Sequence, residues 1–317
     1  MPLRFSAGCR PSEEQNRLIE STYRGRFAPT PSGPLHLGSL LTALASYLEA
    51  RRHGGRWLLR IDDLDTQRIA AGAEAQILHQ LESHGLEWDG PIRRQSEHIE
   101  EYQAALDSLK RQGALYGCRC SRAVLAQSSL PGADGPVYSG HCRQLGLVEG
   151  DLALRVIVPG QQLRFLDAGQ GMQHRDLARD IGDFIVRRRD GIIAYQLACA
   201  VDEHVQMISH VVRGADLLGS TFMQLLLMQR LRLREPRYHH LPILVDREQR
   251  KLSKQNHALA IHSADAGLNL FRCLEWLGQS PPPALQKDPA RLIIGWALAH
   301  WNLSQVPRQA AIEPRTL

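Results

Sequence analysis

Two short segments, far apart in this chain, constrain its fold and chemistry more than any other feature. The first, residues 31–39, contains His36 and Gly38; the second, residues 251–255, contains two lysines. We expect the first segment to lie at a helix start, where free backbone N–H groups and the helix dipole favour phosphate. Lysines suit the charge that builds on a departing pyrophosphate. The pair therefore predicts that both segments meet around one nucleoside triphosphate.

The composition indicates a globular protein that can bind a polyanion. The chain has 317 residues, of which 43% are hydrophobic, enough for a substantial core and for two domains. We find neither an apolar run of the roughly 18 residues needed to cross a bilayer nor a signal-peptide stretch, and therefore expect a cytoplasmic protein with no membrane partner. The net charge of +5 permits a nucleic-acid partner, with Arg51, Arg52 and residues 187–189 as candidate contacts. Solvated arginine-rich faces are equally common.

The order of apolar patterns favours an α/β fold with a Rossmann-type parallel sheet. A strand at 25–28, a helix at 39–52 and a buried strand at 57–61 form the expected nucleotide-binding unit. The remaining expected elements are helices near 70–84, 98–112 and 219–232, strands at 192–197 and 208–214, and a small helical region after Pro283.

Three further stretches, residues 25–33, 60–65 and 212–218, carry a family resemblance. Together with the first two segments they resemble the class I aminoacyl-tRNA synthetases, in the glutamyl and glutaminyl branch, over about residues 23–257. The resemblance implies a ligase that activates an amino acid with ATP and Mg²⁺, with His36 and Lys254 as the catalytic residues. The ATP-binding residues that it implies are Arg26, Phe27, Ala28, Pro29, Thr30, His36, Gly38, Ser39, Lys251 and Lys254.

A pocket that selects glutamate needs fixed cations, for which the planar guanidinium of arginine is suited. The resemblance implies an amino-acid site made of Arg26, Thr30, Asp62, Tyr195 and Arg213, with Asp62 paired to the α-amino group. Structural ion pairs are the competing interpretation of both arginines. Glutamate-specific relatives generally carry Glu at position 62 and glutaminyl relatives Asp, which leaves the amino acid open. The two arginines favour glutamate, since neutral glutamine would leave one of them unpaired.

Three cysteines lie within 25 residues, at 118, 120 and 142. Three thiolates are an incomplete tetrahedral zinc set that needs a fourth ligand. Residue chemistry nominates His141, whereas the resemblance to the zinc site of a shortened glutamyl synthetase-like group nominates Tyr138. We expect one structural zinc ion; reduced cysteines without metal are the alternative. The expected ligands are Cys118, Cys120, Tyr138 and Cys142.

Only 62 residues, 256–317, follow the second segment. Glutamyl synthetases carry a long anticodon-reading region there, so we expect no anticodon-binding domain. The chain resembles the shortened members of this family that attach glutamate to queuosine in tRNA(Asp). That resemblance implies glutamate activation without tRNA, followed by transfer to queuosine at the wobble position in the anticodon loop. We expect the protein to be a monomer. Exposed bases of that loop could stack on Tyr23 or Tyr138.

Two alternatives remain open from the sequence. One is a truncated glutamyl or glutaminyl synthetase that charges a tRNA 3′ end, and the other is a non-catalytic tRNA-binding paralogue. The expected divisions of the chain are an N-terminal extension (1–20), the first half of the Rossmann domain (21–113), a zinc-bearing insertion (114–190), the second half of the Rossmann domain (191–245), and the second lysine segment with a C-terminal helical region (246–317).

Overall fold

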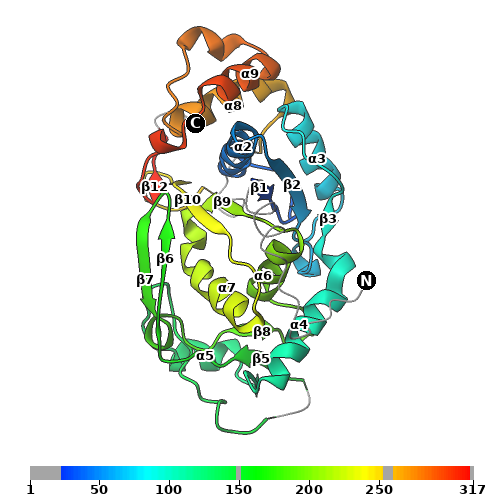
Figure 1. Cartoon of the computed structure of the whole chain (residues 1–317), viewed down its shortest axis with the longest axis vertical. Helices are drawn as coiled ribbons and strands as arrows, with labels where there is room; N and C mark the ends of the chain where they lie inside the picture. The colour runs from blue at the N-terminus through cyan, green and yellow to red at the C-terminus, as the bar shows by residue number, and fades with distance from the viewer. Residues whose placement is uncertain (1–22, 148–150, 253–259, 315–317) are drawn as a thin grey trace, which may run out of the picture.

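The computed structural model describes residues 23–147, 151–252 and 260–314. Its centre is a mostly parallel β-sheet with strands from both halves of the chain (Figure 1). These strands are β1 (Arg24–Phe27), β2 (Arg56–Ile61), β3 (Arg93–Arg94), β6 (Gln162–Asp167), β9 (His210–Gly214) and β10 (Arg237–Leu241). β2 lies between β1 and β3, and β10 lies between β9 and β6, with all these pairings parallel. β1 meets β9 where Ser209 N donates to Arg24 O, which joins the two half-sheets.

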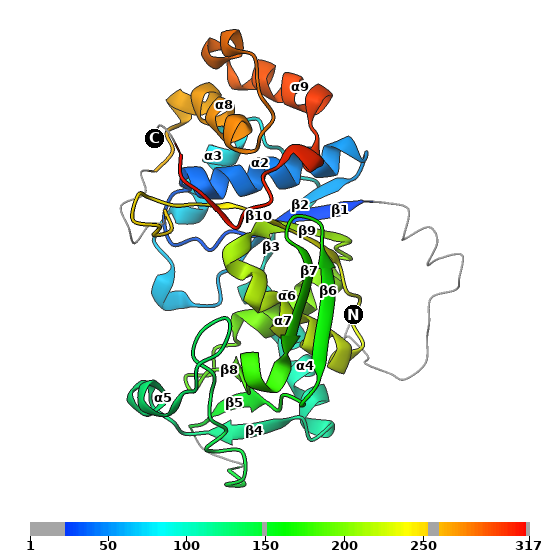
Figure 2. The same cartoon turned by 90° about the vertical axis from the view of Figure 1, so that its left-hand side faces the viewer.

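Helices cover both faces of the sheet, which Figure 2 shows edge-on. They are α2 (Leu37–Arg52), α3 (Ala73–Ser83), α4 (Ile99–Arg111), α6 (Tyr195–Val205) and α7 (Leu218–Leu231). α2 and α3 lie on one face, and α4, α6 and α7 lie on the other. The architecture is therefore the three-layered, Rossmann-like α/β fold that the sequence predicts.

Most predicted elements are confirmed, but the strand expected at 192–197 is wrong. Tyr195 begins helix α6, in which every residue from Leu197 to Glu203 is buried. An unbroken apolar run is typical of a buried parallel strand and equally of a helix that is covered on several sides. α6 is such a helix because it packs against both α4 and α7.

Residues 115–187 contribute to two sheets. The elements of this segment are β4 (Leu115–Cys118), α5 (Arg122–Ser128), β5 (Ala153–Val156), β6, β7 (Gly171–Asp176) and β8 (Ile185–Arg187). β4, β5 and β8 form a small antiparallel sheet, whereas β6 and β7 form an antiparallel hairpin whose β6 pairs with β10 of the central sheet. The hairpin therefore reaches the central sheet, with Asp167 opposite Tyr238.

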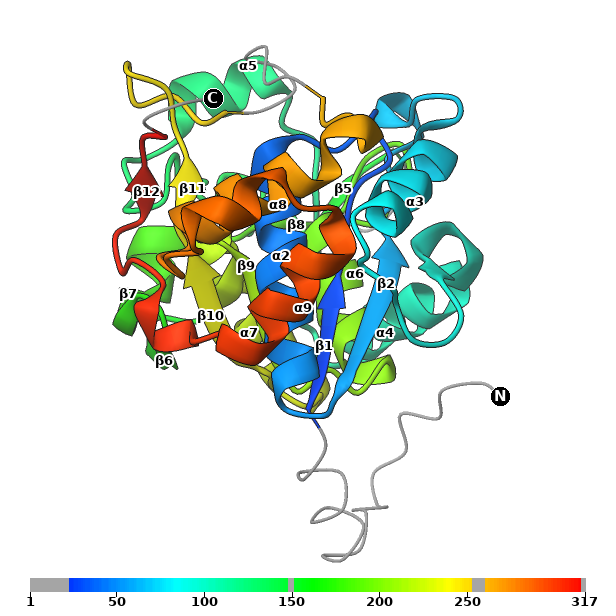
Figure 3. The same ribbon diagram turned by 90° about the horizontal axis from the view of Figure 1, so that it is seen from above.

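The C-terminal region is helical, as predicted, and packs on α2. Its elements are α8 (Ala266–Trp276), α9 (Ala290–His300) and the strand β12 (Ala311–Ile312), which pairs with β11 (Ile243–Leu244). Seen from above, α8 and α9 lie over α2 (Figure 3). α2 is buried on the sheet side and on this outer side, and the apolar residues of all three helices form one core. In the described part of the chain, no helix combines the length and apolarity needed to cross a membrane.

Trp301 fastens this region to α2. Its ring is buried, and its Nε1 donates to Glu49 Oε2 at 2.6 Å. We expect Trp301→Phe to lower the free energy of unfolding by about 1–3 kcal/mol, because it keeps a ring but removes a donor from a buried carboxylate. Urea unfolding measures the change, with Trp296→Phe, at a partly exposed ring, as the matched control. Equal midpoints for wild type and Trp301→Phe would contradict this role of the Glu49 bond.

Candidate active site

His36 caps the start of α2. Its backbone is extended (φ −116°, ψ 170°), and its Nδ1 accepts a hydrogen bond from Ser39 N at 3.3 Å. The first turn of α2 contains no acidic residue, so the N–H groups and the positive end of the dipole are suited to an anion. A Cβ at Gly38 would lie 3.1 Å from the His36 ring, which shows why glycine fits there.

The described residues on both sides of the lysine segment lie next to the start of α2. On one side, the Leu252 carbonyl oxygen lies 3.9 Å from where a Gly38 Cβ would be. On the other, Ala260 forms a β-bridge with His36, and Ile261 N donates to Leu35 O at 3.0 Å. Lys254 lies outside the described residues. The flanks of its segment nevertheless place the two sequence motifs next to each other.

Lys251 links this segment to the stretch that follows β9. Its Nζ lies 2.6 Å from Asp216 Oδ2, and Asp216 comes three residues after Arg213. The distant segments that carry the family resemblance therefore converge at the carboxyl ends of β1, β2 and β9. Ligands of open parallel sheets bind at such an edge.

The residues that follow β1 form the wall between this edge and α2. Ala28, Pro29 and Thr30 are partly exposed, and Pro29 O accepts from Asp62 N at 3.0 Å. The Phe27 side chain is buried and stacks near Trp57, with ring centroids 6.3 Å apart. Phe27 can therefore offer a nucleotide its backbone but not its ring.

Arg26 is buried and already carries a negative partner. Its Nε lies 2.9 Å and 3.1 Å from the two carboxylate oxygens of Glu203, a residue of α6. Burial raises the pKa of Glu203, but the charges of Arg26 and Arg60 outweigh it and hold that pKa below its usual range. Glu203 is thus ionised at neutral pH. From the sequence, a structural ion pair is the alternative to ligand binding at each arginine. The structure contains such an ion pair at Arg26.

Arg213 differs because its partners are neutral. It is 3% exposed, and its guanidinium donates to His240 Nε2 (3.1 Å), Gln224 Oε1 (2.9 Å) and Thr221 Oγ1 (2.7 Å). A further, longer bond reaches Leu217 O at 3.4 Å. Within the described residues no carboxylate forms a salt bridge with Arg213. A buried cation without an anionic partner is costly, and such a group suits an anionic ligand.

Asp62 and Tyr195 lie near these arginines. Burial raises the pKa of Asp62 to about 6, against the lowering by Arg60, whose Nε is 2.7 Å away. Desolvation raises the pKa of the Tyr195 hydroxyl, and Arg213 and Arg26 lower it, so both arginines are within electrostatic reach of that hydroxyl. Tyr195 is the most exposed of the group, at 37%. The structure therefore brings Arg26, Asp62, Tyr195 and Arg213 together.

Sequence reasoning missed the residues that support this group. They are Asp167, Asp202, Glu203, Gln224 and His240, all buried. Asp202 and Glu203 follow directly on the apolar run 192–201, and this adjacency is a signal that could have identified them as buried acids. The others carry no comparable signal, because their roles depend on contacts between distant elements.

The three cysteines form a compact cluster. The Sγ atoms of Cys118, Cys120 and Cys142 lie within 4.8 Å of one another, with Cys120 and Cys142 3.5 Å apart. The Tyr138 hydroxyl is 3.5 Å from the Sγ atoms of Cys118 and Cys120. Zn–S bonds of about 2.3 Å and Zn–O bonds of about 2.0 Å give S···O edges of about 3.5 Å in a tetrahedron. The four side chains thus have the spacing of a zinc site.

The surroundings of this cluster favour a thiolate at Cys118, whereas burial raises the pKa of Cys120. The Arg155 guanidinium lies 3.8 Å from the centre of the Tyr138 ring. Burial raises the pKa of Cys118, but the hydrogen bonds from Tyr138 and Arg155 outweigh it and lower that pKa to about 7. His141 is exposed and is not part of the cluster.

The base-stacking role expected for Tyr23 or Tyr138 is wrong, since both rings are covered. Tyr23 is 6% exposed and lies between His53 and His210, with centroids 4.9 Å and 4.3 Å away. Tyr138 is 7% exposed and lies under Arg155.

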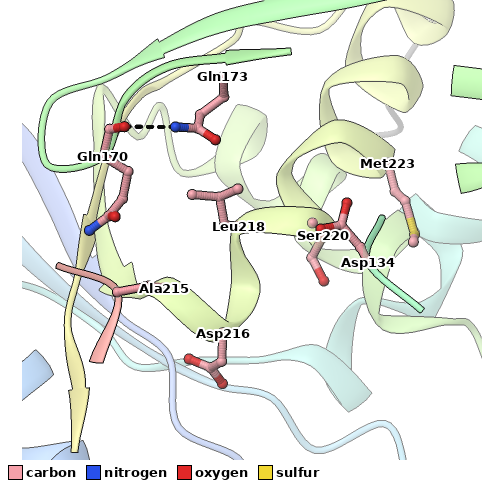
Figure 4. A pocket seen from close by; sticks show the side chains of 10 residues that line it. Asp134, Gln170, Gln173, Ala215, Asp216, Leu218, Ser220 and Met223 are labelled. Atoms are coloured by element: carbon pink, nitrogen blue, oxygen red, sulfur yellow. Dashed lines mark hydrogen bonds between the residues drawn. The ribbon is translucent and has the colours of Figure 1, made fainter. Parts of the chain in front are cut away.

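A cavity of about 430 Å³ lies beside Asp216, between the β6–β7 turn and the start of α7 (Figure 4). Carboxylates and amides make up much of its polar lining. The lining residues are Asp134, Gln170, Gln173, Ala215, Asp216, Leu218, Gly219, Ser220, Met223 and Ala310. Such a lining suits a ligand with several hydroxyl or amino groups.

Comparison with known proteins agrees with this geometry. The family model for the catalytic domain of class I tRNA synthetases (E and Q) matches residues 22–275. A glutamate tRNA ligase from Elizabethkingia meningosepticum, solved in complex with its amino acid, superposes with a TM-score of 0.74 at 25% identity, over 92% of this chain and 67% of that one. The chain therefore has the fold and the catalytic domain of a class I tRNA synthetase of the glutamate and glutamine type.

Relatives of higher sequence identity show which branch of these synthetases the chain belongs to. The chain is 44% identical to the glutamyl-Q tRNA(Asp) synthetase of Pseudomonas paraeruginosa, over 94% of this chain and all of that protein. It is 47% identical to the protein of the same name from Dechloromonas aromatica, over 93% of this chain and 99% of that one. The chain belongs to the glutamyl-Q tRNA(Asp) synthetase family, and it is a ligase.

The different partners of the two arginines predict different effects on stability. Arg26→Gln should lower the free energy of unfolding by about 3–5 kcal/mol, because it leaves the buried Glu203 carboxylate without its nearest cation. Arg213→Gln should lower it by about 1–3 kcal/mol, since it removes hydrogen bonds to neutral acceptors and leaves no buried carboxylate without its cation. Guanidinium unfolding of both variants measures the difference. Equal losses would show that the Glu203 pair does not distinguish the two positions.

Proposed function

We propose that the protein activates L-glutamate with ATP in the absence of tRNA and then transfers it to queuosine at the wobble position of tRNA(Asp). The observation that carries this proposal is Arg213, a buried cation whose partners among the described residues are all neutral, beside Asp62 and Tyr195. An amino acid with a carboxylate supplies the missing anion. The names of the most similar relatives support queuosine in tRNA(Asp) as the acceptor.

In the activation step, α2 and the lysine segment bind ATP. His36, the Gly38 N–H group and Ser39 contact phosphate, and the backbone of residues 26–30 lines the nucleotide. Mg²⁺ neutralises the phosphate oxygens when it is bound with ATP. An α-carboxylate oxygen of glutamate attacks the α-phosphorus, the bond to the bridging oxygen breaks, and pyrophosphate leaves. Lys251 and Lys254 stabilise the charge on the leaving group.

In the amino-acid site, charge selects glutamate. Asp62, ionised above its pKa of about 6, pairs with the α-ammonium group, and Tyr195 and Thr30 add hydrogen bonds. Arg213 binds one substrate carboxylate. Because Glu203 neutralises Arg26, that arginine contributes N–H donors rather than a net charge. Neutral glutamine would leave Arg213 without an anion, which favours glutamate despite Asp62.

In the transfer step, a hydroxyl oxygen of the acceptor attacks the carbonyl carbon of glutamyl-adenylate. The bond to phosphate breaks, AMP leaves, and the hydroxyl proton passes to solvent. The cavity beside Asp216, a residue three positions after Arg213, offers room for a hydroxylated nucleoside. We propose a monomer as the functional unit. The cytoplasm, where ATP and tRNA are available, is the proposed location.

A transfer assay tests this function. The protein is incubated with ATP, labelled glutamate and tRNA(Asp) with or without queuosine, and nucleosides are identified by mass spectrometry. We expect glutamyl-queuosine only with the modified tRNA, and glutamate-dependent pyrophosphate exchange without any tRNA. Label that is lost with the 3′ end would indicate a 3′-charging synthetase. No exchange with glutamate or glutamine would indicate a binding protein instead.

We also propose that the cysteine cluster binds one structural zinc ion. Cys118, Cys120, Cys142 and Tyr138 are the ligands, since their spacing fits a tetrahedron and the cluster lies outside the central sheet. Zinc bound there fixes the end of β4 against the loop that carries Cys142. This role is structural, because four protein ligands leave no open position.

Elemental analysis tests the metal site. We expect about one zinc per chain, and less than about a tenth of that in Cys142→Ser, because a site with two thiolates binds zinc far more weakly. Tyr138→Phe should retain zinc with reduced affinity in a chelator competition, and His141→Ala is the matched control that should behave as wild type. Wild-type protein without zinc, even after refolding with the metal, would refute the proposal.

A further inference from the structure

Arg213 is positioned by a hydrogen-bond chain that begins outside the segments with the family resemblance. Asp167 Oδ2, at the end of β6, lies 2.5 Å from His240 Nδ1, and His240 Nε2 lies 3.1 Å from Arg213 Nε. Asp167, His240 and Arg213 are 1%, 0% and 3% exposed. The three side chains form a continuous buried connection from the β6–β7 hairpin to the amino-acid site.

The arginine determines which ring nitrogen of His240 carries the proton. A guanidinium can only donate hydrogen bonds, so His240 Nε2 must accept the bond from Arg213. In a neutral imidazole the proton then lies on Nδ1, which donates to Asp167. Burial lowers the pKa of His240, Asp167 raises it, and Arg213 lowers it further, with a net decrease. The ring is therefore neutral at neutral pH.

The Asp167 carboxylate is itself fixed. Its Oδ1 accepts from the backbone N–H groups of Gly169 (2.9 Å), Gln170 (2.8 Å) and His240 (3.1 Å). A Cβ at position 169 would lie 2.5 Å from His240 O, so the close approach of this turn to β10 requires glycine. The carboxylate cannot rotate without losing backbone bonds, and it presents one oxygen to the histidine.

We propose that Asp167 and His240 are positioning residues for amino-acid binding. Asp167 sets the tautomer of His240, and His240 Nε2 then fixes the orientation of the Arg213 guanidinium. Arg213 has five N–H groups, and four donate to His240, Gln224, Thr221 and Leu217. Among the described residues the fifth, on Nη1, has no acceptor, and we assign it to the substrate. This role rests on the proposed function, in which Arg213 binds a substrate carboxylate.

Asp167→Asn is the direct test because it changes the charge and one donor but little of the shape. Its amide group donates toward His240 Nδ1, which favours the opposite tautomer and turns the Nε2–H toward Arg213. We expect the KM for glutamate in pyrophosphate exchange to rise about tenfold to a hundredfold, and the KM for ATP to change by less than about twofold. An equal rise for both substrates would indicate a merely structural role and overturn the proposal.

Two substitutions of His240 test the roles of its two ring nitrogens, Nδ1 and Nε2, separately. Glutamine can place a carbonyl oxygen near the position of Nε2, whereas the amide of asparagine reaches only the position of Nδ1. His240→Gln should therefore retain a lower KM for glutamate than His240→Asn. The control is His84→Asn, at a fully buried histidine at the end of α3, which should affect stability without changing either KM. If the KM for glutamate is as high in His240→Gln as in His240→Asn, the proposed role of His240 Nε2 as the acceptor for Arg213 is contradicted.

Two-bond ¹H–¹⁵N correlation spectra of histidine-labelled protein report the tautomer without any substrate. We expect the His240 ring of the wild type to carry its proton on Nδ1, and that of Asp167→Asn to carry it on Nε2. A wild-type Nε2–H tautomer, or an unchanged KM for glutamate in Asp167→Asn, overturns the proposal. Wild-type protein without glutamate-dependent exchange would refute the proposed function instead, while the spectra would still test the hydrogen-bond chain.

Discussion

Arg60, the penultimate residue of β2, has no exposed surface, and the acidic residues of the candidate site surround its charge. Its Nε lies 2.7 Å from Asp62 and 3.5 Å from Asp202, and its Nη1 lies 3.4 Å from Glu203. A buried guanidinium is tolerated only when carboxylates surround it. Two of these acids belong to α6, so the ion pairs fix that helix against the carboxyl ends of β1 and β2. Tyr195, the first residue of the same helix, is placed by the same contacts.

The arginines around the candidate site have two kinds of partner. Arg26, Arg60 and Arg93 all have acidic partners, and Asp202 also accepts from Tyr102 and Gln95. Arg213 has amide, hydroxyl and imidazole partners instead. The first arrangement stabilises the sheet and α6, and the second leaves a positive charge available to an anionic amino acid. One fold thus combines structural cations with a cation that we propose for recognition of the amino acid.

Local patterns were sufficient to predict the nucleotide-binding unit, most helices and the cysteine cluster. Apolar periodicity, the glycines beside His36 and the short Cys-x-Cys spacing are signals that neighbouring residues carry. The strand expected at 192–197 failed because a helix buried on several sides and a buried strand share the same apolar run. The Asp167–His240 connection and the Glu203 pair could not be predicted, since each joins elements that are about 70 to 180 residues apart, as do many buried polar contacts. The contacts of Lys254 remain a prediction, because that residue lies outside the described range.

The β6–β7 hairpin has a consequence for how this family can diverge. It belongs to the same stretch of chain as the cysteine cluster, yet its Asp167 supports a side chain of the amino-acid site. If recombination exchanged this stretch between homologues, the contact of Asp167 with His240 would therefore be exchanged with it. A replacement would have to supply both a carboxylate and a glycine turn at the rim of the sheet, so loop evolution and substrate choice are coupled here.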